Sequence, residues 1–171
     1  MSAVTTLLQP RLVFLAIFLF CVAALGIALY MQHAMMLEPC ALCIMQRVWF
    51  LATALVALAA AIHNPQVKGR KLYGFVAAAT SVIGSGFAIQ QIHLQHLPAD
   101  KIPTCMPSLG YMLEANFPMK KVLEVMFMGD GNCAEITWRD PLFNFFTIPD
   151  LSLIAFAMLI ATALWQALRK V

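Results

Sequence analysis

The stretch LVFLAIFLFCVAALGIALY, from Leu12 to Tyr30, contains no charged residue. A helix rises about 1.5 Å per residue, so roughly 20 apolar residues cross the ~30 Å hydrocarbon core of a bilayer. In lipid, a spanning segment must satisfy its own backbone hydrogen bonds, which a helix does internally. The length of this stretch therefore predicts a transmembrane helix rather than a strand.

Three further stretches have the same length and character. The predicted membrane helices are 12–31, 44–62, 72–90 and 151–168, with Arg47 as the single charge near the start of the second. We predict an all-α membrane protein, a four-helix bundle forming one integral domain over residues 1–171. A cleaved signal peptide is the alternative for the first stretch. Its apolar run exceeds the usual ~7–15 residues and Tyr30 makes a poor cleavage site, so a retained helix is predicted.

The composition excludes several classes of protein. The chain has 171 residues, of which 62% are hydrophobic and 11% are charged, against roughly 45–50% and 25% in ordinary soluble domains. A soluble fold of this size buries only about 70% of its surface, too little to hide so much apolar area. The formal net charge of +3 is too small and scattered for nucleic-acid binding.

Lysine and arginine predict the orientation. Of the loops, 63–71 and the two ends of the chain lie on one side of a four-pass topology, and 32–43 and 91–150 lie on the other. The first side is rich in basic residues and has no acid among them: Arg11, Lys68, Arg70, Lys71, Arg169 and Lys170. The positive-inside rule therefore places both termini in the cytoplasm and the other two loops outside.

The long outer loop contains one amphipathic segment. Apolar residues recur there at helical spacing, with Lys120, Lys121 and Glu124 on the opposite face; the apolar set is Met119, Val122, Leu123, Met126 and Phe127. A soluble loop helix is one interpretation. Since no large soluble core is available, we favour a short helix lying in the membrane interface.

Four of the five cysteines fall in the outer loops. Cys40 and Cys43 form a C-x-x-C in the short loop, and Cys105 and Cys133 suggest a second pair in the long one. If the outside is a bacterial periplasm, disulfides are expected there. Cys21 lies in the middle of the first helix, where a small buried hydrophobe is the simplest interpretation.

The surroundings of the C-x-x-C favour redox chemistry over a structural disulfide. Pro39 commonly precedes a helix, which places Cys43 near a helix N-terminus, where partial positive charge favours a thiolate. Arg47 lies four positions later, so we expect its guanidinium to reach Cys43. An arginine at a membrane boundary is costly and needs a partner. These features predict that Cys43 is a thiolate.

Other uses of the cysteines are less consistent with the sequence. Four cysteines could bind zinc, but zinc gives Arg47 no role, and the long loop lacks a second C-x-x-C. Ile44 follows Cys43, which excludes a C-x-x-C-H haem site. No nucleotide fingerprint or pair of mid-membrane histidines is present. By elimination, the electron acceptor is expected to be a lipid-soluble quinone at the membrane edge.

Three segments of the sequence resemble motifs of one known family, the bacterial disulfide bond formation protein B family. The run from Glu38 to Arg47 (EPCALCIMQR) resembles its P-C-x-L-C-x-x-x-R motif, and 95–98 (QHLP) and 131–135 (GNCAE) resemble its second-loop signatures. With the four-helix layout, the resemblance covers nearly the whole chain. It implies a four-transmembrane-helix bundle with two periplasmic loops, in the bacterial inner membrane.

The resemblance also implies roles for individual residues. Cys105–Cys133 would be the redox-active disulfide that meets a reduced, DsbA-like periplasmic thiol oxidase, and Cys105 would form the mixed disulfide. Cys133 would then attack Cys40 in the Cys40–Cys43 disulfide, and Cys43 would leave as the thiolate that contacts quinone. Arg47 would hold the quinone. Many family members carry a basic residue or histidine near the outer end of the third helix, where the candidate here is His93.

We therefore predict an inner-membrane, quinone-dependent thiol oxidase, with ubiquinone or menaquinone as acceptor. A vitamin K epoxide reductase-like enzyme also joins quinone to cysteine pairs, but its C-x-x-C lies toward the last membrane helix, the reverse of the order here. A metal-binding or structural membrane protein with stapled loops is the non-enzymatic alternative.

Overall fold

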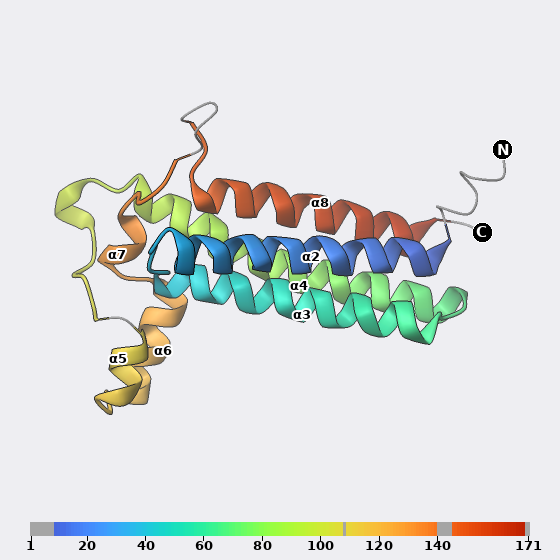
Figure 1. The fold of residues 1–171 in the computed structure, drawn as a ribbon, viewed down its shortest axis with the longest axis horizontal. Helices are drawn as coiled ribbons and strands as arrows, with labels where there is room; N and C mark the ends of the chain where they lie inside the picture. Colours follow the sequence, from blue (N-terminus) through green and yellow to red (C-terminus); the bar gives the residue numbers. More distant parts are fainter. Residues whose placement is uncertain (1–8, 108, 140–144, 170–171) are drawn as a thin grey trace.

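Four long helices form the body of the molecule. The computed structural model describes residues 9–107, 109–139 and 145–169. The helices α2 (Pro10–Ala34), α3 (Ala41–His63), α4 (Val67–Gln95) and α8 (Ile148–Leu168) run side by side as a bundle (Figure 1). Each is long and apolar enough to cross a membrane. The described residues contain no strand beyond an isolated bridge between Arg139 and Thr147, so the predicted all-α four-helix architecture is confirmed.

Local sequence signals explain where these helices begin and end. Pro10 occupies the first turn of α2, where its missing N–H costs nothing. Asn64 ends α3 in the left-handed conformation, and its N–H bonds to the Ala60 carbonyl. At the start of α8, Thr147 and Asp150 form a capping box, in which the Asp150 carboxylate accepts the Thr147 N–H at 2.9 Å. The bundle is therefore delimited by caps and turns rather than by hydropathy alone.

The helix α4 begins earlier than the predicted span. It starts at Val67, so Lys68, Arg70 and Lys71 lie in its first turns instead of in a loop. Arg70 is buried and donates to the Arg169 carbonyl at 2.8 Å, at the end of α8. Hydropathy detects only the part of a helix that matches the lipid core, whereas backbone hydrogen bonding continues into the polar flanks.

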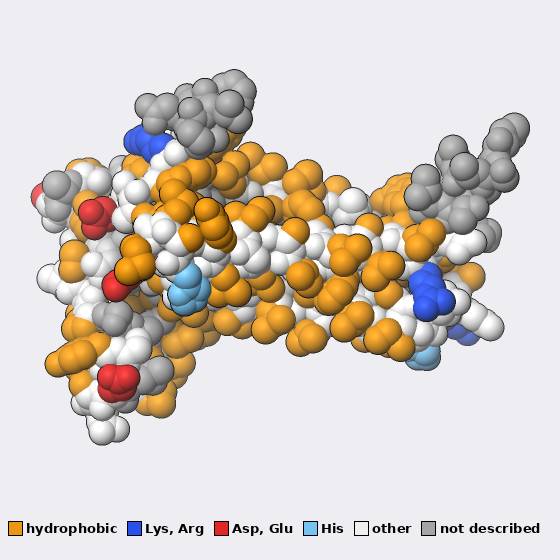
Figure 2. All heavy atoms as spheres, in the orientation of Figure 1, with side chains coloured by type: hydrophobic (Ala, Val, Ile, Leu, Met, Phe, Trp, Pro, Cys, Tyr) orange, Lys and Arg blue, Asp and Glu red, His pale blue; other side chains and the backbone are white. Residues whose placement is uncertain are grey.

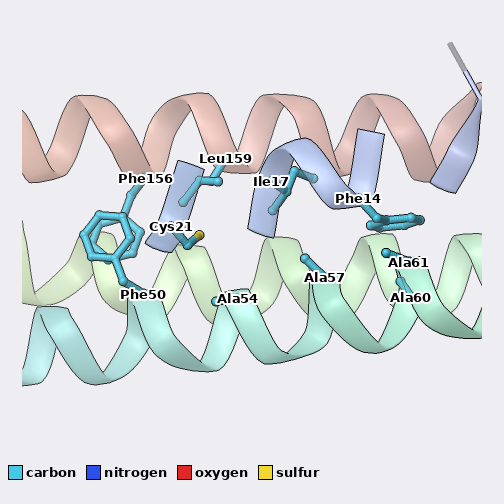
Figure 3. Close-up of a cluster of buried hydrophobic side chains, with 10 residues drawn as sticks. All are labelled: Phe14, Ile17, Cys21, Phe50, Ala54, Ala57, Ala60, Ala61, Phe156 and Leu159. Atoms are coloured by element: carbon cyan, nitrogen blue, oxygen red, sulfur yellow. The ribbon is translucent and has the colours of Figure 1, made fainter. Parts of the chain in front are cut away.

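Small residues allow the helices to approach closely. A Cβ added to Gly74 would lie 2.8 Å from the Ala167 Cβ, and one added to Gly84 would overlap the ring of Phe156. Beside this contact, Phe50 and Phe156 stack with ring centroids 4.0 Å apart. Figure 3 shows this core, which extends along the bundle from Phe50 and Phe156 to Phe14; it joins side chains of α2, α3 and α8 and includes the fully buried Cys21.

The connection between α4 and α8 covers one end of the bundle. It contains η1 (Ala99–Lys101), α5 (Leu109–Glu114), α6 (Met119–Met128) and α7 (Gly131–Ala134). In Figure 1, α5 and α6 run across the bundle axis. The predicted amphipathic helix is α6; it buries Val122 and Val125 in a core cluster with Leu42 and leaves Leu123 and Phe127 exposed.

The surface of the bundle differs between its flank and its two ends. Figure 2 shows an apolar flank along the bundle. Lysine and arginine lie at the end where α2 begins and α8 ends, and the acidic residues lie at the opposite end, where basic atoms also appear. This pattern suits a protein whose long axis crosses a bilayer. The multi-pass membrane character predicted from the sequence is supported by the four apolar helices.

Candidate functional site

The C-x-x-C lies where α3 begins. Cys40 is the N-cap residue in an extended conformation, and Cys43 lies in the first turn. This geometry brings the two sulfur atoms to 3.2 Å from each other, so a short movement closes a disulfide. Both side chains are half-buried beneath the segment that connects α4 to α8.

Two buried glutamines contact this motif. The Gln91 amide of α4 donates to Cys43 Sγ at 3.3 Å and is 3.5 Å from Cys40 Sγ. The Gln46 amide donates to Gln91 Oε1 at 2.8 Å, and both glutamines are at most 4% exposed. A buried amide needs a partner, and here Gln46 holds Gln91 with its N–H group toward the sulfur atoms. Our sequence reasoning missed both glutamines, although two glutamines in otherwise apolar helices were a usable signal.

Arg47 points toward α2 rather than directly at Cys43. Its guanidinium donates to Gln32 Oε1 and, at 3.2 Å, to the Ala28 carbonyl. Its charge remains within electrostatic range of Cys43. The expected contact with the cysteine is therefore electrostatic, because the direct donors to Cys43 are Cys40 and, from the neighbouring helix, Gln91.

Cys133 connects the second loop to the first. It lies in α7, is fully buried, and packs in the same core cluster as Cys40. Hydrogen bonds to Cys133 and then to Cys43, together with burial, raise the pKa of the Cys40 thiol. The fold places a cysteine of each loop in contact, although they are far apart in sequence.

Cys105 is exposed, in a segment held against α7. The Met106 N–H donates to Asp130 Oδ2 at 3.1 Å, and the Asn132 amide donates to the Met106 carbonyl at 2.7 Å. A Cβ on Gly131 would lie 2.8 Å from Cys105 Sγ, so this close approach requires glycine. The arrangement presents Cys105 at the surface while its predicted partner, Cys133, is buried.

Several other predicted features have definite positions. All five cysteines are free thiols in this structure. His93, the candidate at the outer end of the third helix, is exposed and does not line the cavity described below. Among the described residues, no three His, Cys, Asp or Glu side chains form a group that could hold a metal ion.

An apolar cavity of about 610 Å³ opens beside the C-x-x-C. It lies between α2, α3 and α8, under residues 132–138. Its walls are largely apolar, with Phe20, Ile27, Phe50 and Met158 among them, and its polar lining includes Cys43, Arg47, Gln46 and Gln91. A flat apolar molecule with one or two hydrogen-bond acceptors fits such a lining.

Known proteins resemble the chain over nearly its whole length. The family model for disulfide bond formation protein DsbB matches residues 10–166. The chain belongs to the DsbB family. A disulfide bond formation protein B of Saccharophagus degradans is 44% identical over 98% of both chains, and one of Stutzerimonas stutzeri is 42% identical over 96% of this chain and 98% of its own. Disulfide bond formation protein B 1 of Pseudomonas aeruginosa is 39% identical over 96% of this chain and 98% of its own.

As a DsbB-family protein, the chain is a membrane oxidoreductase that forms disulfides and has a thiol–disulfide exchange partner. The resemblance noted in the sequence is thereby confirmed. The positions of its cysteines are consistent with this activity, because in disulfide exchange each attacking sulfur must come close to the sulfur that it attacks.

Proposed function

We propose that this protein reoxidises a DsbA-like thiol oxidase of the periplasm and transfers the electrons to membrane quinone. The observation that carries the proposal is the packing of Cys133 and Cys40 in one buried cluster, which joins the two outer loops beside an apolar cavity. The protein would lie in the bacterial inner membrane with both termini in the cytoplasm, as the lysine and arginine distribution indicates.

In this proposal, electrons enter at Cys105 and leave at Cys43. The partner's thiolate attacks the exposed Cys105 of the Cys105–Cys133 disulfide, since a surface sulfur is the one a soluble protein can reach. A mixed disulfide forms at Cys105, the Cys105–Cys133 bond breaks, and Cys133 leaves and takes up a proton. Cys133 then attacks Cys40, the sulfur it already contacts. The Cys40–Cys43 bond breaks, and Cys43 leaves as a thiolate stabilised by the Gln91 amide and the nearby Arg47 charge.

The cavity fits a quinone head group. A quinone, when bound, supplies a two-electron acceptor with two carbonyl oxygens. The cavity offers apolar walls for the ring, and Arg47 and Gln91 carry N–H donors at its polar lining. Cys43 lies at the same place, so the thiolate and the acceptor would be adjacent.

The test is quinone reduction by purified protein mixed with a reduced DsbA-like oxidase. We expect reduction of added quinone together with oxidation of the soluble thiols, and loss of both in Cys40→Ser. Normal turnover in Cys40→Ser would refute the relay, and thiol oxidation without quinone reduction would refute the acceptor.

We further propose that α6 lies in the membrane interface. It crosses the bundle axis in Figure 1, and Met119, Leu123, Phe127 and Met128 remain exposed after Val122 and Val125 are buried. This exposed apolar face would enter the boundary between head groups and acyl chains. Phe127→Asp should shift α6 toward water, measured by loss of lipid quenching of a probe at Leu123, whereas Lys120→Asp on the polar face should not.

A further inference from the structure

The side chain of Asp130 connects both cysteines of the long loop. Its carboxylate is 4% exposed. Oδ2 accepts the Met106 N–H at 3.1 Å and the Asn132 amide at 2.7 Å, which holds the Cys105 segment against α7. Oδ1 accepts the Cys133 thiol at 3.4 Å, an ordinary length for a hydrogen bond from sulfur. Oδ2 therefore holds the Cys105 segment in place, and Oδ1 faces the sulfur of Cys133.

The charged and titratable surroundings of this carboxylate are simple. The groups that donate hydrogen bonds to it are neutral: the Met106 N–H and the Asn132 amide to Oδ2, and the Cys133 thiol to Oδ1. The Cys40 thiol, at the start of α3, packs in the same buried cluster as Cys133. Among the described residues, the only salt bridge joins Lys121 to Glu124, so Asp130 has no cationic partner there. Apart from sulfur, Asp130 is thus the one proton acceptor that contacts Cys133 in the described structure.

We propose that Asp130 is a catalytic residue, the proton acceptor for Cys133 when Cys133 attacks Cys40. The inference rests on the proposed relay and adds to it a proton path. As the Cys133–Cys40 bond forms, the Cys40–Cys43 bond breaks and its electron pair stays on Cys43. The proton of the Cys133 thiol passes to Asp130 Oδ1 and later to solvent.

The geometry explains why a base is needed at this position. Cys133 is fully buried, so near pH 6 the solvent removes its proton only slowly. A free thiolate facing a carboxylate would place two like charges together, which is unfavourable in a low dielectric. Proton transfer therefore accompanies sulfur–sulfur bond formation and does not precede it. The buried thiol is then reactive only when the Cys40–Cys43 disulfide is present to be attacked.

The test follows transfer between the pairs without quinone. Fully oxidised, quinone-free protein is mixed with a small dithiol, quenched with acid and alkylated, and the reduced cysteines are mapped by mass spectrometry. Reduction of Cys105 and Cys133 reports entry, and later reduction of Cys40 and Cys43 reports transfer. Cys133→Ser gives the background of direct reduction by the dithiol. Because no quinone is present, failure of the quinone proposal does not affect the result.

In Asp130→Asn, we expect transfer to slow about 100-fold near pH 6, a usual contribution of a general base, while entry stays within about twofold. The defect should shrink as pH rises, because hydroxide increasingly removes the proton. Asp130→Glu should recover part of the rate near pH 6. Asp100→Asn, an exposed aspartate of the same loop, should behave like wild type.

Asn132→Ala separates clamping from proton transfer. It removes the hydrogen bonds to Met106 and to Asp130 Oδ2 but leaves Oδ1 beside Cys133. We expect this variant to lower the rates by the same factor at every pH. A pH-independent defect in Asp130→Asn, or no defect at all, would overturn the proposal. Wild-type protein that transfers no electrons from the outer pair to the inner pair would instead refute the relay itself.

Discussion

At the residue scale, two side chains determine what the sulfur atoms of the C-x-x-C contact. Gln91 donates to Cys43, and Gln46 holds Gln91 in that orientation. A hydrogen bond to a charged group contributes about 1.5–3 kcal/mol, which is a tenfold effect or more on a reaction that forms a thiolate. Arg47 adds a full positive charge at somewhat longer range.

Gln91→Leu should therefore lower the rate of quinone reduction about tenfold or more, because the leaving Cys43 thiolate loses its direct donor. The measurement is turnover at saturating quinone in correctly folded protein. Gln90→Leu is the matched control, since Gln90 is only half-buried and donates weakly, at 3.4 Å, to the Met128 carbonyl. Equal turnover in the two variants would show that the Gln91 contact has no part in the reaction.

Arg47→Ala should raise the KM for quinone about tenfold, because both a cation and a forked donor are lost. Arg47→Lys should restore the charge but only part of the affinity, since an ammonium cannot bond both Gln32 and the Ala28 carbonyl in the same planar geometry. If lysine substitutes fully, Arg47 is only an interfacial anchor. Insertion into membranes is checked first for each variant.

At the element scale, helix packing depends on glycine at one contact and not at another in the same helix. Gly84 touches the Phe156 ring, which also stacks on Phe50, so this position joins α4, α8 and α3. Gly86 lies two residues later and has open space where a Cβ would be. Alanine substitutions at Gly84 and Gly86 therefore distinguish the effect of packing on stability from the effect of helix propensity.

Gly84→Ala should cost about 1–3 kcal/mol, the usual penalty for overpacking a core. Gly86→Ala should leave stability unchanged or raise it by up to about 1 kcal/mol, because alanine favours a helix more than glycine does. Thermal unfolding midpoints in detergent compare the two variants. An equal midpoint for both would mean that α4 and α8 do not meet at Gly84.

At the scale of the whole molecule, all the described redox groups lie at one end of the bundle and the basic flanks at the other. The cysteines of both loops gather where α3 begins, while Arg70 and Arg169 meet at the opposite end. This polarity allows a reaction with the proposed periplasmic partner only if the cysteine end faces outward. The orientation of the bundle in the membrane therefore also determines whether the proposed reaction is possible.

Reporter fusions test this orientation. Fusions after Lys71 and after Lys170 should report a cytoplasmic location, and fusions near Glu114 a periplasmic one, because lysine and arginine are retained on the cytoplasmic side. A periplasmic signal after Lys71 would invert the topology. It would also remove the oxidising surroundings on which the proposed function depends.

By itself, the sequence determined the number of spanning helices, the amphipathic α6 and the cysteine motif at the start of α3. These features depend on residues close together in the chain, through apolar length, helical spacing and the proline just ahead of α3. Sequence reasoning was incomplete at the ends of the helices, where the bounds depend on more than the apolar length. It placed Arg70 in a loop, although α4 extends to Val67 because backbone hydrogen bonding does not stop at the edge of the lipid core.

Only the tertiary structure decided which side chains meet. Gln91 reaches Cys43 across 48 positions of sequence, and Cys133 reaches Cys40 across a greater separation. The same applies to Arg47, whose guanidinium turned to α2 instead of remaining on the face of its own helix. Such contacts depend on the rotation and register of neighbouring helices. These are set by packing over the whole interface, at small residues such as Gly84, and a local pattern carries no information about them.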